Sequence, residues 1–275
     1  MPRKLTLATP AERAAHHKRL QARKARERRE QRELIRQLEK ADLGLDSESF
    51  DVLVIPCGFD GQSALPAERI REYTEHLRKM IREADDVSDP VRARTEEKMR
   101  ERAEINENRL VAEPMLRAIG DRLCGVCRGG CCTAGGDSAF ITRATIRRLR
   151  AQMPELSDDD ILEAYLARLP ARTITGACVN QASDGCALPM EMRSDTCNGF
   201  FCDSLSDWIE SPPEERASQV LAIQRNESFW DQNDMQRSNH IIDVALVTAE
   251  AVQPLSQAAG LPAARAAVAD PEERD

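Results

Sequence analysis

Eight of the nine cysteines in the chain lie within residues 124–202, and this grouping restricts the fold more than any other feature of the sequence. A buried thiol packs as a small hydrophobic group, so cysteines used only for packing would be scattered through the core. Thiols grouped with glycines between them are typical of a metal site, a disulfide framework or a redox centre. The eight residues are Cys124, Cys127, Cys131, Cys132, Cys178, Cys186, Cys197 and Cys202.

The sequence favours a metal over disulfides. Charges at Arg3 and Lys4 stand where a secretory signal would have apolar residues, and the best apolar run, residues 241–247, is much shorter than the roughly 18 residues of a membrane span. We therefore expect a cytoplasmic protein that does not enter the membrane. Because a reducing compartment keeps thiols from pairing, metal ligation is the better explanation of the cysteines.

The cysteine spacing suits soft metals without selecting one. The Cys124-x-x-Cys127 loop lets two sulfurs reach one metal, and the glycines at 125, 129 and 130 allow a tight backbone. Adjacent side chains usually diverge, so Cys131 and Cys132 should serve different metals or have different roles. Two neighbouring four-sulfur sites satisfy this condition, and so does one [4Fe–4S] cluster with the other cysteines structural or redox-active. The expected cofactor is zinc or an iron–sulfur cluster, with all eight cysteines as candidate ligands.

The N-terminal region predicts a long helix with little apolar surface. Thr9-Pro10-Ala11-Glu12 has the pattern of a capping box, and strong helix formers continue to about Asp42. Residues 1–42 hold thirteen Lys or Arg against six Asp or Glu, which leaves a charge of −15 on the rest of the chain. Residues 10–40 could therefore bind RNA or an acidic protein partner. A solvated helix held by charge pairs is the favoured interpretation, because no aromatic residues interleave with the basic ones.

The composition divides the chain into a basic helical arm (1–47), a helical region (48–120), a Cys-cluster metal-binding domain (121–253) and a disordered tail (254–275). We expect a mostly α fold with an irregular Cys-rich core containing a few short strands. Strands are predicted at 51–60 and 139–141, and residues 240–252 fit either a helix or a strand. Helices are predicted over 66–83, 89–111, 115–123, after a Thr142 cap, after a Ser157 cap, and from Ser211 through Ile223.

Cys57 and the histidines are separated from the cysteine cluster along the chain. Cys57 could be a ninth ligand or a reactive thiol, but a packed structural cysteine is favoured. His76 lies beside an apolar helix face, which indicates a surface or hydrogen-bonded side chain rather than a ligand. The other histidines, His16, His17 and His240, are also remote in sequence from the cluster.

The cysteine order resembles the YkgJ-type family of cysteine-cluster proteins, which are described as zinc- or iron-chelating domains. The motif Cys124-x2-Cys127-x3-Cys131-Cys132 is similar to the opening motif of that family. Residues 139–142 are similar to its next segment, an apolar stretch before a Thr- or Ser-capped helix.

The later half of the family pattern resembles Cys178, Gly185-Cys186 and the run from Arg193 through Cys202. Ser194 stands where a proline is common, Asn198 stands where an arginine is common, and the span to Cys202 is one residue longer. The resemblance covers residues 120–205 and implies metal chelation without implying an activity. Some flagellin lysine methylases carry a similar cluster.

Three functions follow as hypotheses. The leading one is a metal-binding protein whose eight cysteines hold zinc or an iron–sulfur centre. The second is an enzyme that uses an iron–sulfur cluster for group transfer or redox chemistry, although the chain has no Gly-rich nucleotide-binding loop. The third is an interaction module in which zinc shapes the fold and the basic N-terminal helix binds RNA or an acidic partner.

Overall fold

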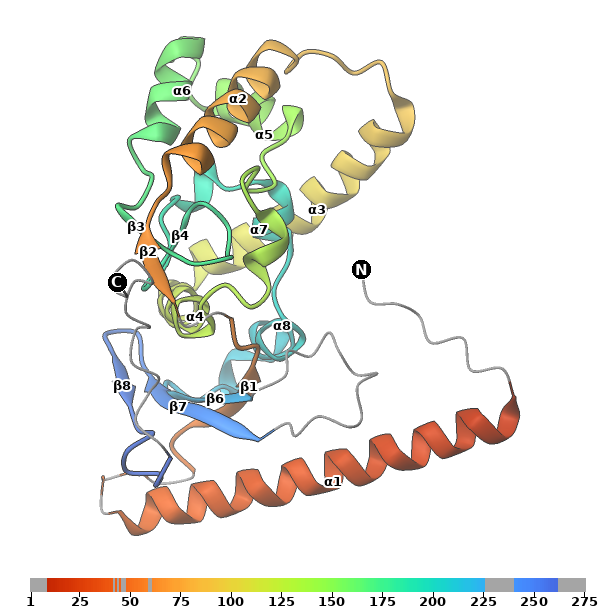
Figure 1. The fold of residues 1–275 in the computed structure, drawn as a ribbon, viewed down its shortest axis with the longest axis vertical. Helices are drawn as coiled ribbons and strands as arrows, with labels where there is room; N and C mark the ends of the chain where they lie inside the picture. Colours follow the sequence, from red (N-terminus) through yellow and green to blue (C-terminus); the bar gives the residue numbers. More distant parts are fainter. Residues whose placement is uncertain are drawn as a thin grey trace, which may run out of the picture.

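The computed structural model describes residues 9–41, 43, 45, 48–58, 61–225 and 240–261, and its fold is mostly α, as expected (Figure 1). The helices are α1 (Pro10–Lys40), α2 (Ala67–Arg82), α3 (Pro90–Ala112), α4 (Pro114–Cys127), α5 (Arg143–Gln152), α6 (Asp158–Leu166), α7 (Asp195–Gly199) and α8 (Asp203–Glu210). The strands are β1 (Asp51–Ile55), β2 (Gln62–Ala64), β3 (Arg172–Ile174), β4 (Gln181–Ala182), β5 (Gly185–Cys186), β6 (Val220–Arg225), β7 (Ile241–Val247) and β8 (Val252–Pro254).

Three of the predicted helix starts are confirmed by their caps. Thr9, Thr142 and Ser157 each accept a hydrogen bond from the backbone three residues on and form a capping box. Each cap satisfies backbone N–H groups that the first helical turn leaves without a partner. The N-terminal helix, predicted to run to about Asp42, ends at Lys40.

A four-stranded sheet with the order β1-β6-β7-β8 forms the lower part of the molecule in Figure 1. β1 pairs with β6 in parallel, and the other two pairings are antiparallel. The end of α1 covers one face, where Leu34 and Leu38 pack with Leu221 and Ile223 of β6. The helices α4 and α8 cover the opposite face.

The prediction of a helix from Ser211 through Ile223 is wrong. The prolines after Ser211 form only a short 3-10 turn, residues 213–215, and the apolar residues that follow belong to β6. Every residue of β6 is buried, because helices cover both faces of the sheet. A strand buried on both faces has a continuous apolar run, which periodicity cannot separate from a buried helix.

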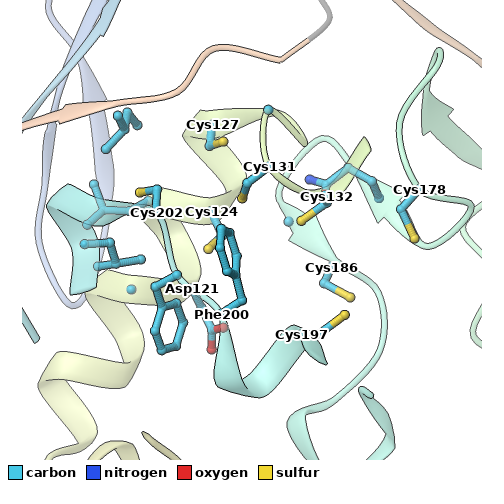
Figure 2. Close-up of a pocket in the computed structure, with 18 of the residues that line it drawn as sticks. Asp121, Cys124, Cys127, Cys131, Cys132, Cys178, Cys186, Cys197, Phe200 and Cys202 are labelled. Carbon is cyan, nitrogen blue, oxygen red and sulfur yellow. The ribbon is translucent and has the colours of Figure 1, made fainter. Parts of the chain in front are cut away.

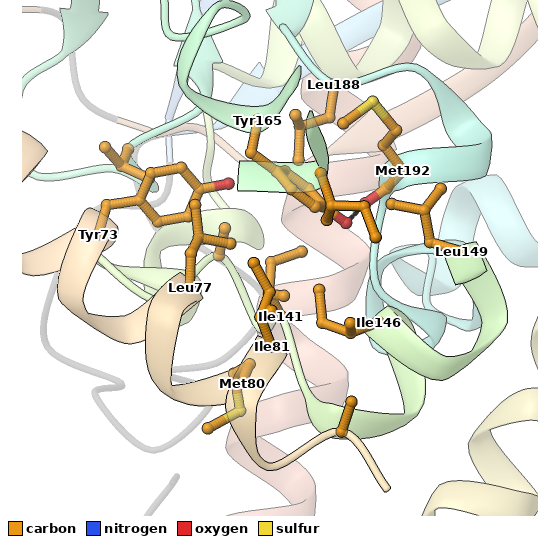
Figure 3. Packing of buried hydrophobic residues seen from close by; sticks show 14 of the residues in the cluster. Tyr73, Leu77, Met80, Ile81, Ile141, Ile146, Leu149, Tyr165, Leu188 and Met192 are labelled. Atoms are coloured by element: carbon orange, nitrogen blue, oxygen red, sulfur yellow. Dashed lines mark hydrogen bonds between the residues drawn. The ribbon is translucent and has the colours of Figure 1, made fainter. Parts of the chain in front are cut away.

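The upper part of the molecule is a helical layer formed by α2, α5 and α6. Tyr73 and Leu77 of α2, Ile146 of α5 and Tyr165 of α6 are fully buried in its core (Figure 3). The Tyr165 hydroxyl donates to the Met192 carbonyl oxygen, at 2.8 Å, and so joins this core to the cysteine-rich segment.

Two local predictions near the cysteines are wrong. Residues 139–141 form a turn rather than a strand, and Ala139 and Phe140 adopt left-handed φ angles of 49° and 57°. The sequence of residues 173–202 predicts short extended pieces and turns rather than helices, but the part around Cys197 and Cys202 contains α7 and leads into α8. Both conformations depend on tertiary contacts, which a local sequence pattern does not contain.

The chain after Pro254 continues to pack against the sheet. Leu255, Ser256 and Ala259 are buried, and the rest of the predicted tail from residue 262 lies outside the described residues. None of the helices in the described part of the chain is long and apolar enough to cross a membrane.

Candidate metal centre

The last turn of α4 delivers the first two cysteines. Cys124 and Cys127 lie on this turn, and Arg128 ends the helix in a left-handed conformation with φ 52°. Gly129 follows with φ 79°, which glycine adopts at no steric cost, and the chain then turns back so that Cys132 begins a short 3-10 helix, residues 132–135. The predicted tight loop is therefore a helix end followed by a turn.

The end of α4 and the loop after it make close backbone contacts with the segments around Gly58 and Asp184. The Gly58 amide donates to the Cys127 carbonyl oxygen at 2.8 Å, and a Cβ on Gly58 would meet the Arg128 carbonyl oxygen at 1.9 Å. A Cβ on Gly125 would meet the Asp184 carbonyl oxygen at 2.6 Å. These glycines let the cysteine segments approach each other closely.

All eight candidate cysteines line a single cavity of about 1610 Å³. They come from four segments of the chain: the end of α4 with the loop after it, the turn between β3 and β4, β5, and the stretch from α7 to the start of α8. Cys127, Cys178 and Cys202 are buried and the other five are half-buried. The eight residues predicted as metal ligands therefore lie together in the fold.

The eight thiols divide into two groups of four (Figure 2). We call Cys124, Cys127, Cys131 and Cys202 the first thiol group, and Cys132, Cys178, Cys186 and Cys197 the second thiol group. Figure 2 shows the sulfurs of Cys186 and Cys197 pointing toward each other. The adjacent residues Cys131 and Cys132 lie at the boundary of the two groups, where their thiols are hydrogen bonded to each other, so these neighbouring side chains do not diverge.

The pKa values of the thiols show which cysteines lie close together, and Cys132 interacts with both groups. Besides burial, the pKa of Cys178 is raised by Cys186, Cys197 and Cys132, and that of Cys202 is raised by Cys127. Cys132 also raises the pKa of Cys124. The two groups are therefore close enough to interact through Cys132.

Burial keeps most of these thiols protonated when no cation is present. It raises the pKa of Cys124 well above its ordinary value, that of Cys197 to about 12 and that of Cys202 to about 11. A hydrogen bond from the Cys131 thiol acts oppositely and lowers the pKa of Cys127 to about 7. A low-dielectric site resists the charge of several thiolates unless a metal or a basic group compensates it.

Arg193 is a positive group that serves both thiol groups. It lies near Cys124 in the first group and near Cys186 in the second, and its charge favours the thiolate form of each. Its guanidinium is held by the Leu188 carbonyl oxygen at 2.8 Å and the Asp121 carboxylate at 3.2 Å.

An ion-pair network holds α7, which carries Cys197. The Asp195 carboxylate accepts hydrogen bonds from Arg100 of α3 and Arg148 of α5, both at 2.9 Å. The Asn198 amide donates to Glu107 of α3 at 2.7 Å. α7 therefore has a fixed position although it is only five residues long.

The donor chemistry fits a thiophilic metal, but the thiols do not form a closed metal site. None of the nine cysteines is in a disulfide. Within the described residues, no three His, Cys, Asp or Glu side chains are placed so that they could hold an ion. Space next to the sulfurs is preserved by glycines, because a Cβ on Gly130 would lie 3.2 Å from the Cys127 sulfur and one on Gly135 would lie 3.3 Å from the Cys178 sulfur.

The remaining candidates take other positions. The Cys57 thiol donates to the Gly58 carbonyl oxygen at 3.4 Å, and His76 is hydrogen bonded to the Ile141 carbonyl oxygen at 2.7 Å. His16 of α1 lines the cavity, whereas His240 is an exposed residue just before β7.

Sequence reasoning missed three other residues of the cavity wall. Asp121 lies on α4 one turn before Cys124, so helical spacing could have indicated it. Phe200 is half-exposed on the cavity wall, and Asn180 is fully buried there. The Asn180 amide donates to the Tyr73 hydroxyl at 3.1 Å, while its Oδ1 atom has no hydrogen-bond partner among the described residues.

No known protein family, curated protein or solved structure matches the chain. The resemblance to the YkgJ-type family therefore stays a prediction. The same is true of RNA or an acidic protein as a partner of α1.

Proposed function

We propose that this protein binds metal at two adjacent centres, one at each thiol group. The gathering of eight thiols on one cavity, in two sets of four, supports the proposal most strongly. Four thiolates are the usual ligand set of a structural zinc site and of an iron–sulfur cluster. Zinc and iron–sulfur both fit this donor set.

In this proposal each residue at the centres has a defined role. The eight cysteines hold the metal as thiolates, and Arg193 offsets part of the negative charge of both groups. The ion pairs of Asp195 hold α7 so that Cys197 faces the second group. A metal with four thiolate ligands has no open position for a substrate, so zinc here would supply stability and an iron–sulfur cluster would supply electron transfer.

Metal and acid-labile sulfide analysis of protein purified without oxygen tests the proposal. We expect either about two zinc ions per chain without colour, or iron with matching sulfide and a visible absorption band. The double variants Cys124→Ser/Cys127→Ser and Cys178→Ser/Cys186→Ser should each lose metal. Cys57→Ser is the matched control and should retain it. Wild-type protein without metal would refute the proposal.

A second candidate function, an iron–sulfur enzyme with an organic substrate, is favoured by the size of the cavity. Its 1610 Å³ exceeds the roughly 300–1,000 Å³ of ordinary small-molecule pockets, and apolar residues such as Phe140, Phe200 and Leu205 form part of its wall. Gly120 of α4 also lines the cavity, and a Cβ there would meet nothing within 4 Å.

The dye 8-anilinonaphthalene-1-sulfonate tests whether this apolar space takes up an organic molecule. The metal-loaded protein should bind the dye, and Gly120→Leu should weaken that binding by filling the space. The candidate requires iron and labile sulfide as well. A colourless zinc protein whose dye binding is the same in the wild type and in Gly120→Leu would exclude it.

A further inference from the structure

We propose that the two centres load as one cooperative unit, so that metal at one thiol group closes the other. This inference rests on the proposed function and concerns its regulation. It comes from the order in which the chain supplies cysteines to the two groups. Two segments each contribute to both groups, so neither group can move independently of the other.

The first shared segment runs from the last turn of α4 through the loop that follows it. It supplies Cys124, Cys127 and Cys131 to the first group and Cys132 to the second. Consecutive Cα atoms are only about 3.8 Å apart, so a movement that draws Cys131 onto a metal also moves Cys132. The Gly58–Cys127 backbone hydrogen bond fixes one end of the loop, so the Cys131–Cys132 end is the part that moves when metal binds.

The stretch from α7 to α8 is the second shared segment. It supplies Cys197 to the second group and Cys202 to the first, with four residues between them. Asn198 anchors this stretch, since its amide donates to Glu107 and to the Met190 carbonyl oxygen and its own carbonyl oxygen accepts from Asn106. At Gly199, a Cβ would lie 3.3 Å from backbone atoms of α3. The connection between the two groups is therefore stiff.

Metal binding at the two groups is coupled because the thiols lie near one another but are not yet placed around an ion. Among the described residues, no three candidate ligands are placed to hold a metal, so binding must draw sulfurs inward at either group. The first metal draws in the shared Cys131–Cys132 turn, while the stiff α7–α8 stretch holds Cys197 and Cys202 at a constant separation. The second metal then finds the shared cysteines of its own group already in place. Coupling between sites is reciprocal and is typically 5- to 150-fold in affinity.

Each group also has a pair of cysteines outside the Cys131–Cys132 and Cys197–Cys202 connections, and these pairs allow a reciprocal test. They are Cys124 and Cys127 on α4 for the first group, and Cys178 and Cys186 for the second. Metal-free full-length protein would be titrated with Zn²⁺ against a competing chelator, and the species with zero, one and two metals would be counted by native mass spectrometry. Wild-type protein at half-saturation should show mostly the species with zero and two metals.

In Cys178→Ser/Cys186→Ser we expect zinc affinity at the first group to fall about 5- to 150-fold, and Cys124→Ser/Cys127→Ser should do the same to the second group. Three glycines inserted between Phe200 and Phe201 keep all eight thiols but loosen the stiff connection. This variant should still bind two zinc ions, and its singly loaded species should become prominent.

A singly loaded species that dominates in wild-type protein at half-saturation would overturn the proposal, because it shows independent sites. Unchanged affinity at the remaining group in both double variants would overturn it as well. If the proposed metal binding itself is wrong, the result is a different one, because wild-type protein would then bind no zinc at either group. The wild-type measurement needs no substitution and decides the question even if a variant fails to fold.

Discussion

Replacing Asp195 with alanine should destabilise the metal-free protein by about 3 kcal/mol. The Asp195 side chain is 8% exposed and accepts hydrogen bonds from Arg100 and Arg148, and the Arg148 side chain is 9% exposed. Removing one partner of a buried ion pair costs about 3–5 kcal/mol, because a buried charge loses its compensation. Arg148 keeps the Glu191 carbonyl oxygen as an acceptor at 2.7 Å, which places the expected loss at the lower end of that range.

Two further variants make this measurement decisive. Asp195→Asn keeps an acceptor oxygen and removes the charge, so it should cost about half as much. Asp158→Ala is the matched control, because Asp158 also lies in the first turn of a helix and pairs with Arg150, but it is 59% exposed. An exposed pair contributes less than about 1 kcal/mol.

Urea unfolding of the metal-free variants under reducing conditions measures all three changes. The reasoning would be refuted if Asp195→Ala and Asp158→Ala lost the same stability within about 0.5 kcal/mol. Such a result would mean that the ion pairs do not hold α7. A different result is an Asp195→Ala protein that is clearly destabilised but binds as much metal as the wild type. It would show that Cys197 reaches the second thiol group without the ion pairs of Asp195.

Three other substitutions and one change of pH have clear expected outcomes. Gly58→Ala should destabilise the protein by several kcal/mol, because the added Cβ would overlap the Arg128 carbonyl oxygen. Gly120→Ala should stabilise it by up to about 1 kcal/mol, because the added Cβ meets no atom within 4 Å and alanine favours the helix. Thermal unfolding measures both changes. Leu38→Ala should cost about 2–5 kcal/mol in urea unfolding, because Leu38 is 1% exposed beneath the sheet. Zinc affinity, measured by chelator competition, should weaken as the pH falls from about 8 to about 6, because the metal must displace protons from buried thiols such as Cys197, whose pKa is raised to about 12. An unchanged affinity over that range would contradict the thiol assignment.

The starts of several helices could be predicted because they depend on hydrogen bonds between residues close in sequence. Thr9 and Ser157 signal helix starts by hydrogen bonds within four residues, so their effect needs no distant partner. The gathering of the eight cysteines at one place also followed from their grouping in the sequence. These features depend on neighbours in sequence, which a single chain displays directly.

The sheet and the conformation of the cysteine segments depended on distant contacts instead. β1 pairs with β6 in parallel across more than 160 residues, and no short pattern announces such a pairing. Phe140 adopts a left-handed φ that aromatic residues rarely take, and α7 is a five-residue helix held by Arg100 and Arg148. Each case is a tertiary contact that overrides local preference.

The same distant contacts predict that the body of the protein stays folded when metal is removed. A zinc finger unfolds without metal because the ion replaces a core that is too small. Here the described chain has three apolar clusters, and the cysteine segments are also held by contacts that need no ion, such as Asp195 with Arg148 and Tyr165 with Met192. Metal removal should therefore leave far-ultraviolet circular dichroism nearly unchanged, while hydrogen exchange should speed up in residues 128–132 and 197–202. Loss of most helical signal on chelation would mean that the ions, rather than these contacts, hold the fold together.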